Sequence, residues 1–193
     1  MKICFATNNP NKVNEINLAV GELVHIISLA DINCKEEIPE EQDTIEGNSS
    51  QKANYVKNNY NVDCFADDTG LEVLALGGEP GVYSARYAGL DGDAKNNMNL
   101  LLKNMEGVSD RRAQFKTVIT LILNGKEIQF EGVAKGNIRT ELSGEEGFGY
   151  DPIFEPEGYD ITFAEMSMDE KNKISHRGQA VRKLVQFLKS QKL

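Results

Sequence analysis

Several features that would place this 193-residue protein in a membrane or outside the cell are missing from its sequence. No stretch approaches the roughly 18 consecutive apolar residues that a membrane-spanning helix needs. The first residues, Met1 to Ala6, read as a strand and lack the architecture of a signal peptide. The sequence therefore predicts a cytoplasmic protein with no membrane partner.

Basic residues are also scarce. The chain has 21 Lys and Arg against 30 Asp and Glu, a formal net charge of −9. A protein that gains affinity by neutralising many phosphates needs a basic face, so this balance argues against a nucleic-acid partner. It leaves room for a locally basic pocket that takes a small anion.

Cysteine and histidine are few, with three Cys and two His. Cys4, Cys34 and Cys64 are odd in number and lack paired metal-type spacing, so buried, reduced thiols are expected. Neither His25 nor His176 lies near a cysteine in the sequence to support a nucleophilic thiol. We also find no repeat, low-complexity tract or linker, which predicts a single domain over residues 1–193.

The first part of the chain predicts a strand, a turn and a helix. Ile3–Ala6 reads as a strand, Asn9 as a helix N-cap, and Pro10 as the first helical residue. Apolar residues then recur at spacings of three and four, at Val13, Ile16, Val20 and Leu23. A second buried strand is predicted over Val62–Ala66.

The second half predicts a helix, a hairpin and a final helix. The helix is expected over residues 95–105, and the hairpin turns at Asn124-Gly125 between two apolar runs. The last helix has Ser175 as its N-cap and an apolar face of Val181, Leu184, Val185 and Leu188. We therefore predict an α/β protein with a doubly wound parallel core, extended by an antiparallel hairpin.

Two adjacent carboxylates, Asp67 and Asp68, follow the predicted strand Val62–Ala66. Ligands of open α/β sheets collect beyond the carboxyl ends of the strands, and a hard cation such as Mg²⁺ prefers carboxylate oxygens. Side chains alternate along extended backbone, so only one of the two is expected to face a ligand. The alternative is that Asp67 to Gly70 form only a polar turn.

The connection from Thr7 to Lys12 joins the first strand to the first helix. Backbone N–H groups at such a helix start bind anions, Lys12 adds a charge, and Thr7 adds a hydroxyl donor. A phosphate would suit this loop. The alternative is ordinary capping by Asn9 with a solvated Lys12, because no Walker-type or dinucleotide-type glycine pattern is present.

Two further segments have a composition that suits a nucleotide base. Phe148 and Tyr150 lie in a glycine loop closed by Asp151-Pro152, which would stack on a purine or simply form a turn with two core aromatics. His176 and Arg177 lie at the start of the last helix, where Arg can bind carbonyl oxygens or phosphate.

An acidic run spans residues 36–46, and most of it is explained as a solvated face. One or two of its acids would complete a metal site with Asp68.

Together, the segments resemble the inosine/xanthosine triphosphate pyrophosphatase family over nearly the whole chain. Five motifs in the family's order carry the resemblance: Phe5-Ala6-Thr7-Asn8-Asn9 with Lys12, Ala66-Asp67-Asp68-Thr69-Gly70-Leu71, Gly77 to Tyr87, Phe148-Gly149-Tyr150-Asp151-Pro152, and Glu170-Lys171 with Ser175 to Ala180.

The resemblance implies an elongated mixed β-sheet flanked by helices, with two lobes around a central cleft, and a homodimer. It implies Mg²⁺-dependent hydrolysis of deaminated purine nucleoside triphosphates (ITP, dITP and XTP) to the monophosphate and pyrophosphate, which keeps them out of DNA and RNA. The implied partner is a small-molecule nucleoside triphosphate.

The resemblance also implies roles for single residues. Asp68 is the catalytic acid or base and a metal ligand, and Glu40 is the second metal ligand. The substrate-binding residues are Thr7, Asn8, Asn9, Lys12, Thr69, Phe148, Gly149, Tyr150, Asp151, Lys171, His176 and Arg177. Asn8 departs from the family, which usually has Gly at this position, and its side chain is expected to narrow the phosphate loop.

Three other readings remain open from the sequence. A module that senses a purine nucleotide without hydrolysing it would not need both Asp68 and Lys12. A purely structural α/β domain would not need basic and aromatic motifs in three separate loops. A related pyrophosphatase for pyrimidine or modified nucleotides is the closest alternative, and the His176-Arg177 motif favours purines.

Overall fold

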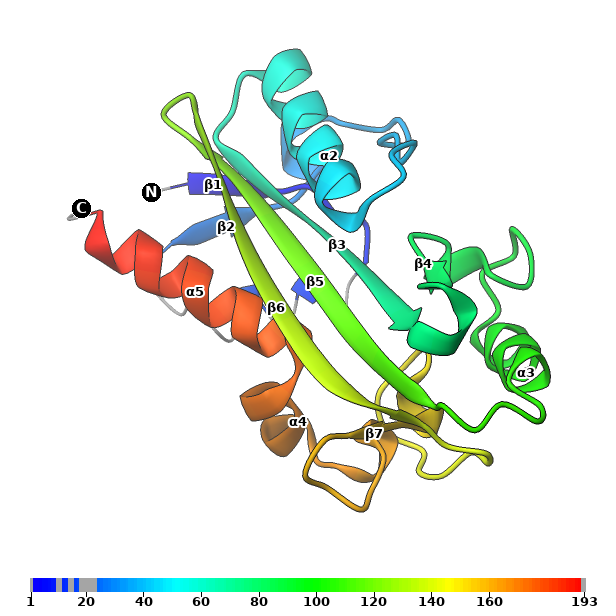
Figure 1. Ribbon diagram of the computed structural model, residues 1–193. Helices are drawn as coiled ribbons and strands as arrows, with labels where there is room; N and C mark the ends of the chain where they lie inside the picture. Colours follow the sequence, from blue (N-terminus) through cyan, green and yellow to red (C-terminus); the bar gives the residue numbers. More distant parts are fainter. Residues whose placement is uncertain (1, 10–11, 14–15, 18–23, 192–193) are drawn as a thin grey trace. The chain divides into compact units, whose positions relative to one another are not determined.

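The computed structural model describes residues 2–9, 12–13, 16–17 and 24–191. Within them lies a seven-stranded mixed sheet in the order β2-β1-β3-β5-β6-β7, with β4 paired to β3 (Figure 1). The strands are β1 (Lys2–Phe5), β2 (His25–Ile27), β3 (Cys64–Val73), β4 (Pro80–Gly81), β5 (Arg112–Leu123), β6 (Lys126–Ile138) and β7 (Phe154–Pro156). The α-helices bounded within the described residues are α2 (Ile45–Tyr60), α3 (Ala94–Asn104), α4 (Met168–Ile174) and α5 (His176–Ser190).

The parallel part of the sheet consists of β2, β1 and β3. Phe5 of β1 is in register with Phe65 of β3, and the two rings stack with centroids 4.4 Å apart. The predicted parallel core is therefore confirmed for these strands. The β3-β4 and β6-β7 pairs are antiparallel, which makes the sheet mixed.

The expected start of the first helix is confirmed at its N-cap. The Lys12 backbone N–H donates to Asn9 Oδ1 at 3.4 Å, and the Val13 N–H donates to the Asn9 carbonyl. Lys12, Val13, Ile16 and Asn17 are helical. Pro10, Val20 and Leu23, which belong to the same prediction, lie outside the described residues.

The predicted hairpin is confirmed. Asn124 and Gly125 alone separate β5 from β6, and both have positive φ, at 51° and 76°. Two-residue hairpin turns of this kind require positive φ at both positions, which Asn and Gly tolerate best.

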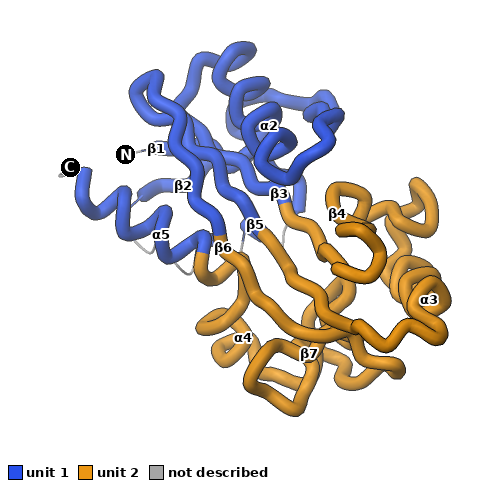
Figure 2. The backbone as a smooth tube through the Cα atoms, viewed as in Figure 1, with its two compact units in different colours: residues 1–68, 117–131, 180–193 blue, residues 69–116, 132–179 orange. Residues whose placement is uncertain are grey.

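The chain divides into two compact units (Figure 2). Unit 1 comprises residues 1–68, 117–131 and 180–193, and unit 2 comprises residues 69–116 and 132–179. The division follows the two lobes implied by the family resemblance. Strands β3, β5 and β6 contribute residues to both units.

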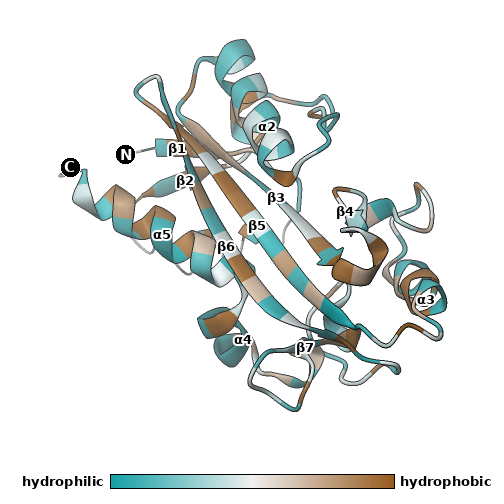
Figure 3. Cartoon of the chain, in the orientation of Figure 1, coloured by the Kyte–Doolittle hydropathy of each residue, from teal (hydrophilic) through white to brown (hydrophobic). Residues whose placement is uncertain are grey.

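Unit 1 packs a different helix on each face of its sheet. Phe5, Phe65 and Ile119 belong to the core that includes the apolar residues of α5, which recur every three or four positions (Figure 3). Cys4, Cys64 and Ala66, which alternate with them along the strands, form a second core with α2. Successive strand residues face opposite sides, so this alternation places α2 and α5 on opposite faces.

Unit 2 has its own core, in which aromatic rings pack against one another. The ring centroids of Phe115 in β5 and Phe154 in β7 lie 4.7 Å apart, edge to face, and the Phe163 ring packs against both. Met98 and Leu101 of α3 belong to the same core.

One element differs from the prediction. The predicted strand end at Ala66 is wrong, and so is the alternative of a polar turn at Asp67 to Gly70, because β3 runs without a break from Cys64 to Val73. The three residues that follow, Leu74–Leu76, form a 3-10 helix. Among the described helices, none has the length and apolar character needed to cross a bilayer.

Candidate functional site

The two carboxylates on β3 each face a different lysine of unit 1. Lys12 Nζ lies 2.9 Å from Asp67 Oδ2, and Lys52 Nζ lies 3.3 Å from Asp68 Oδ1. Lys52 Nζ also donates to Glu40 Oε1. We call these five residues the acid-lysine centre. Each aspartate thus has its own lysine partner, and the expectation that only one of the two faces a ligand stays a prediction.

Burial and neighbouring charges shift the pKa values of Asp68 and Lys52 in opposite directions. Burial raises the pKa of Asp68, against the attraction of Lys52. Burial alone would lower the pKa of Lys52, but attraction to Asp68, Asp67 and Glu40 outweighs it, so the pKa is raised. Lys52 is therefore a buried cation, and Asp68 is a carboxylate with an increased affinity for a proton, as a general base requires.

The donor set at Asp68 also suits a divalent cation. Asp68 Oδ2 is buried and has no hydrogen-bond partner among the described residues, while Oδ1 faces Lys52. Lys52 brings Glu40 to the same point, so two carboxylates converge on one cation. Mg²⁺ in nucleotide sites takes one or two carboxylates together with phosphate oxygens and water, and Asp68 with Glu40 fit that requirement.

The predicted phosphate loop directly follows β1. Asn9 N–H donates to Thr7 Oγ1 at 3.2 Å, so the loop is closed by its own side chains. Asn8 is exposed between them, and Lys12 lies one turn into the helix. The structure thus places Thr7, Asn9 and Lys12 in unit 1 with Asp67.

Lys52 is the member of the acid-lysine centre that sequence reasoning missed. It lies on the buried face of α2 with Ile45, Ser49 and Val56, and only 6% of its surface is exposed. A lysine within the buried stripe of a helix predicts a buried partner of opposite charge, because lysine is almost never fully buried without one. The weak amphipathicity of this segment concealed the stripe.

A second group of predicted residues comes together in unit 2. Lys171 Nζ lies 2.5 Å from Asp151 Oδ2, and both side chains are buried. Lys171 Nζ and Arg177 Cζ lie 5.0 and 5.3 Å from the centroid of the Phe148 ring. We call Phe148, Asp151, Lys171, His176 and Arg177 the basic-aromatic group. Phe148 is 37% exposed, so part of an aromatic surface stays accessible beside buried cations.

His176 and Arg177 begin α5, as predicted. His176 is buried and stacks on Phe115 with centroids 4.6 Å apart, and Arg177 Nη2 lies 3.5 Å from Thr69 Oγ1. Ser175 caps the helix, because its hydroxyl accepts from the Gly178 N–H. The structure therefore brings Thr69, His176 and Arg177 into one unit with Phe148.

The glycine loop before α4 fixes Asp151. A Cβ at Gly147, which has a φ of +78°, would lie 2.2 Å from Asp151 Oδ2. The Phe148 N–H donates to that same oxygen at 2.8 Å. Gly149 also has positive φ. Tyr150 is buried and donates its hydroxyl to the Ser84 carbonyl, so the ring packs in the core of unit 2.

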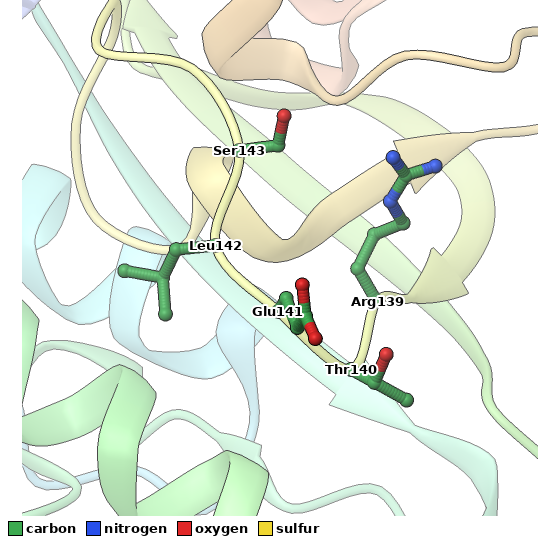
Figure 4. Close-up of a pocket in the computed structure, with 5 residues that line it drawn as sticks. All are labelled: Arg139, Thr140, Glu141, Leu142 and Ser143. Atoms are coloured by element: carbon green, nitrogen blue, oxygen red, sulfur yellow. The ribbon is translucent and has the colours of Figure 1, made fainter.

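A surface hollow of about 500 Å³ lies elsewhere in unit 2 (Figure 4). It is lined by Arg139, Thr140, Glu141, Leu142 and Ser143. None of the predicted site residues lines it, and Arg139 is already paired with Glu155.

Unit 1 gathers carboxylates around a buried lysine, and unit 2 holds two cations within 5.3 Å of the centroid of one aromatic ring. Such groups suit a divalent cation with phosphate and a flat ring, respectively. The model of the Ham1 family matches residues 3–187. The chain belongs to the Ham1 family.

Curated relatives and solved structures agree with this membership. The chain is 58% identical to the dITP/XTP pyrophosphatase of Flavobacterium johnsoniae over 192 residues, covering 100% of both chains. It is 55% identical to the dITP/XTP pyrophosphatase of Flavobacterium psychrophilum, over 98% of this chain and 100% of the relative. The Ham1 protein of Staphylococcus aureus has the same fold, with a TM-score of 0.94, 38% identity and 100% coverage of both chains.

Proposed function

We propose that the protein is a nucleoside triphosphate pyrophosphatase that hydrolyses ITP, dITP and XTP to the monophosphate and pyrophosphate. This activity keeps deaminated purine nucleotides out of DNA and RNA. The observation that carries the proposal is the acid-lysine centre, in which the buried Asp68 and the exposed Glu40 share the buried cation Lys52. Full-length relatives named dITP/XTP pyrophosphatase support the substrate class.

We propose Mg²⁺ as the cofactor, held by Asp68 and Glu40. The buried Asp68 Oδ2, which lacks a hydrogen-bond partner within the described part of the chain, supports this assignment. Mg²⁺, when bound, neutralises phosphate charge and makes a coordinated water more acidic.

Asp68 is the general base in the proposed reaction. The attacking water forms a bond to the α-phosphorus as its proton passes to an Asp68 carboxylate oxygen, and the bond to the bridging oxygen breaks to release pyrophosphate. In the metal-free protein, burial raises the pKa of Asp68. Lys52 and Lys12 offset the negative charge of the phosphates, and Thr7, Asn8 and Asn9 hold them with hydroxyl, amide and backbone donors.

The basic-aromatic group is proposed to bind the base. The exposed part of Phe148 offers a face for stacking, and Gly149 and Tyr150 shape the loop behind it. His176 and Arg177 donate hydrogen bonds to the 6-oxo group that hypoxanthine and xanthine carry. Adenine has an amine at this position and would leave those buried donors unpaired, which a site of this kind rejects strongly.

We also propose that the protein is a cytoplasmic homodimer that binds a small nucleotide and does not bind nucleic acid. Three free, buried cysteines are typical of proteins from a reducing compartment. The net charge of −9 opposes association with a polyanion.

The identity of the attacked phosphorus tests the proposed reaction. Hydrolysis of ITP with Mg²⁺ in ¹⁸O-labelled water should place the label in the monophosphate and leave the pyrophosphate unlabelled, as read by mass spectrometry. Label in the pyrophosphate or in inorganic phosphate would contradict attack at the α-phosphorus. Asp68→Asn should reduce turnover at saturating Mg²⁺ by at least 100-fold, and turnover near that of the unaltered protein would remove Asp68 as the base.

A further inference from the structure

A short acidic loop, residues 40–42, lies on the N-terminal half of α2 and is held there at three successive positions. Lys52 binds the Glu40 carboxylate, Gln51 Oε1 accepts from the Glu41 N–H at 2.9 Å, and Asn48 Oδ1 accepts from the Gln42 N–H at 2.9 Å. All of these residues belong to unit 1.

The three helical partners of this loop share one face of α2. Asn48, Gln51 and Lys52 are spaced at i, i+3 and i+4, the positions that are neighbours on a helix surface. Asn48 is only 1% exposed, so its amide is committed to the interior and not to solvent. The loop therefore receives two side-chain acceptors for its backbone N–H groups, and one cation for its Glu40 carboxylate, from a single helix.

The loop also approaches the helix closely. A Cβ added at Gly47 would lie 2.8 Å from Gln42 Cβ and 2.9 Å from Thr44 Oγ1. Contacts shorter than 3.0 Å force a shift, so only glycine allows the loop to reach this position without one. Close packing at Gly47 and hydrogen bonds at Asn48 and Gln51 act on the same residue pair, Glu41 and Gln42.

The same helix is fastened to the strand that carries Asp68. Ser49 Oγ lies 3.2 Å from the Ala66 carbonyl oxygen and 2.8 Å from Thr120 Oγ1. Ala66 is two residues before Asp68 on β3, and Ser49 is one turn before Lys52 on α2. Helix α2 thus connects the loop that carries Glu40 to the strand that carries Asp68.

We propose that Asn48 and Gln51 are positioning residues that hold Glu40 beside Asp68 before a divalent cation arrives. The proposal rests on the proposed function, in which Glu40 and Asp68 are the metal ligands. A preset loop has already lost its conformational freedom at folding, so cation binding does not have to order it. Loss of one neutral hydrogen bond to the loop should weaken Mg²⁺ binding by about 3- to 10-fold.

Near-isosteric variants on one helix test the proposal. Gln51→Met and Asn48→Leu remove the acceptors that face the loop. Asn54→Leu is the matched control, because Asn54 lies on the same helix but donates to Glu127 and to the Ser50 carbonyl and not to the loop. Circular dichroism verifies that each variant is folded, and the partly buried Gln51 keeps the test valid should Asn48→Leu fail to fold.

Two measurements without substrate give the outcome. Amide exchange by NMR in the metal-free protein should speed up at Gln42 in Asn48→Leu and at Glu41 in Gln51→Met, and at neither in Asn54→Leu. Asn48→Asp, which keeps an oxygen acceptor, should restore slow exchange at Gln42. Calorimetric titration with Mg²⁺ should show weaker binding in the two loop-facing variants and unchanged binding in the control.

The failure of this proposal differs from the failure of the proposed function. If Glu40→Gln weakens Mg²⁺ binding but Gln51→Met and Asn48→Leu do not, the positioning role is wrong and the metal site stands. If neither Glu40→Gln nor Asp68→Asn weakens Mg²⁺ binding, the proposed metal site is wrong, and the positioning role falls with it.

Discussion

The buried ion pair of unit 2 allows the most quantitative prediction. Lys171 and Asp151 lie 2.5 Å apart with side chains that are 7% and 3% exposed, and Asp151 Oδ2 also accepts from the Phe148 N–H. Asp151→Asn keeps the size of the side chain and removes its charge, so Lys171 is left as a buried cation without a counterion.

The expected cost follows from that burial. Removing one partner of a buried pair destabilises a protein by about 3–5 kcal/mol, because the remaining charge is uncompensated. This is a large part of a typical total stability of about 5–15 kcal/mol. At a slope of about 2 kcal/mol per molar urea, the unfolding midpoint should fall by about 1.5–2.5 M. The chain has no tryptophan, so unfolding is followed by circular dichroism.

The double variant Asp151→Asn/Lys171→Met separates charge from packing. It removes the lone cation as well, and its stability should therefore recover much of the loss seen with Asp151→Asn alone. A single-variant cost below about 1 kcal/mol, or a double variant whose loss equals the sum of both single losses, would refute the reasoning from buried charge.

Three further predictions concern catalysis, base selection and alkaline stability. Lys52→Met should lower kcat by about 100- to 1000-fold, because the reaction loses a buried cation that offsets phosphate charge; a kcat within 10-fold would count against it. Arg177→Ala should lower the ratio of kcat/KM for ITP over ATP, and an unchanged ratio would remove Arg177 from base recognition. Burial raises the pKa of both Cys4 and Cys64 to about 12, so these thiols ionise first in the unfolded chain and the free energy of unfolding should fall as pH rises from about 9 toward 12. Replacing both with Ala should flatten that pH dependence in urea titrations, and an unaltered slope would contradict it.

Elements with strong local signals were predictable from the sequence. A two-residue hairpin turn requires positive φ at both positions, which Asn124 and Gly125 adopt more readily than most residues. This pair therefore predicted the hairpin turn correctly. The apolar face of the last helix and its Ser175 cap were equally clear, because both signals lie within a few residues of each other. Local chemistry alone determines these features.

Features that depend on distant partners were not predictable. Asp67 to Gly70 have the composition of a turn, but β3 continues through them because it pairs with neighbouring strands and its carboxylates meet Lys12 and Lys52. The role of Lys52 was hidden for the same reason, since its partners Glu40 and Asp68 are 12 and 16 residues away. The family resemblance supplied Asp68 and Glu40, and contacts in the folded chain were needed to add Lys52.

The most direct test of the central claim is pyrophosphate release from a panel of nucleoside triphosphates, with Mg²⁺ and with a chelator. The account predicts rapid release from inosine and xanthosine triphosphates, slow release from guanosine, adenosine and thymidine triphosphates, and none from any of them with chelator. Equal release from all five, or binding of inosine triphosphate without any release, would contradict it.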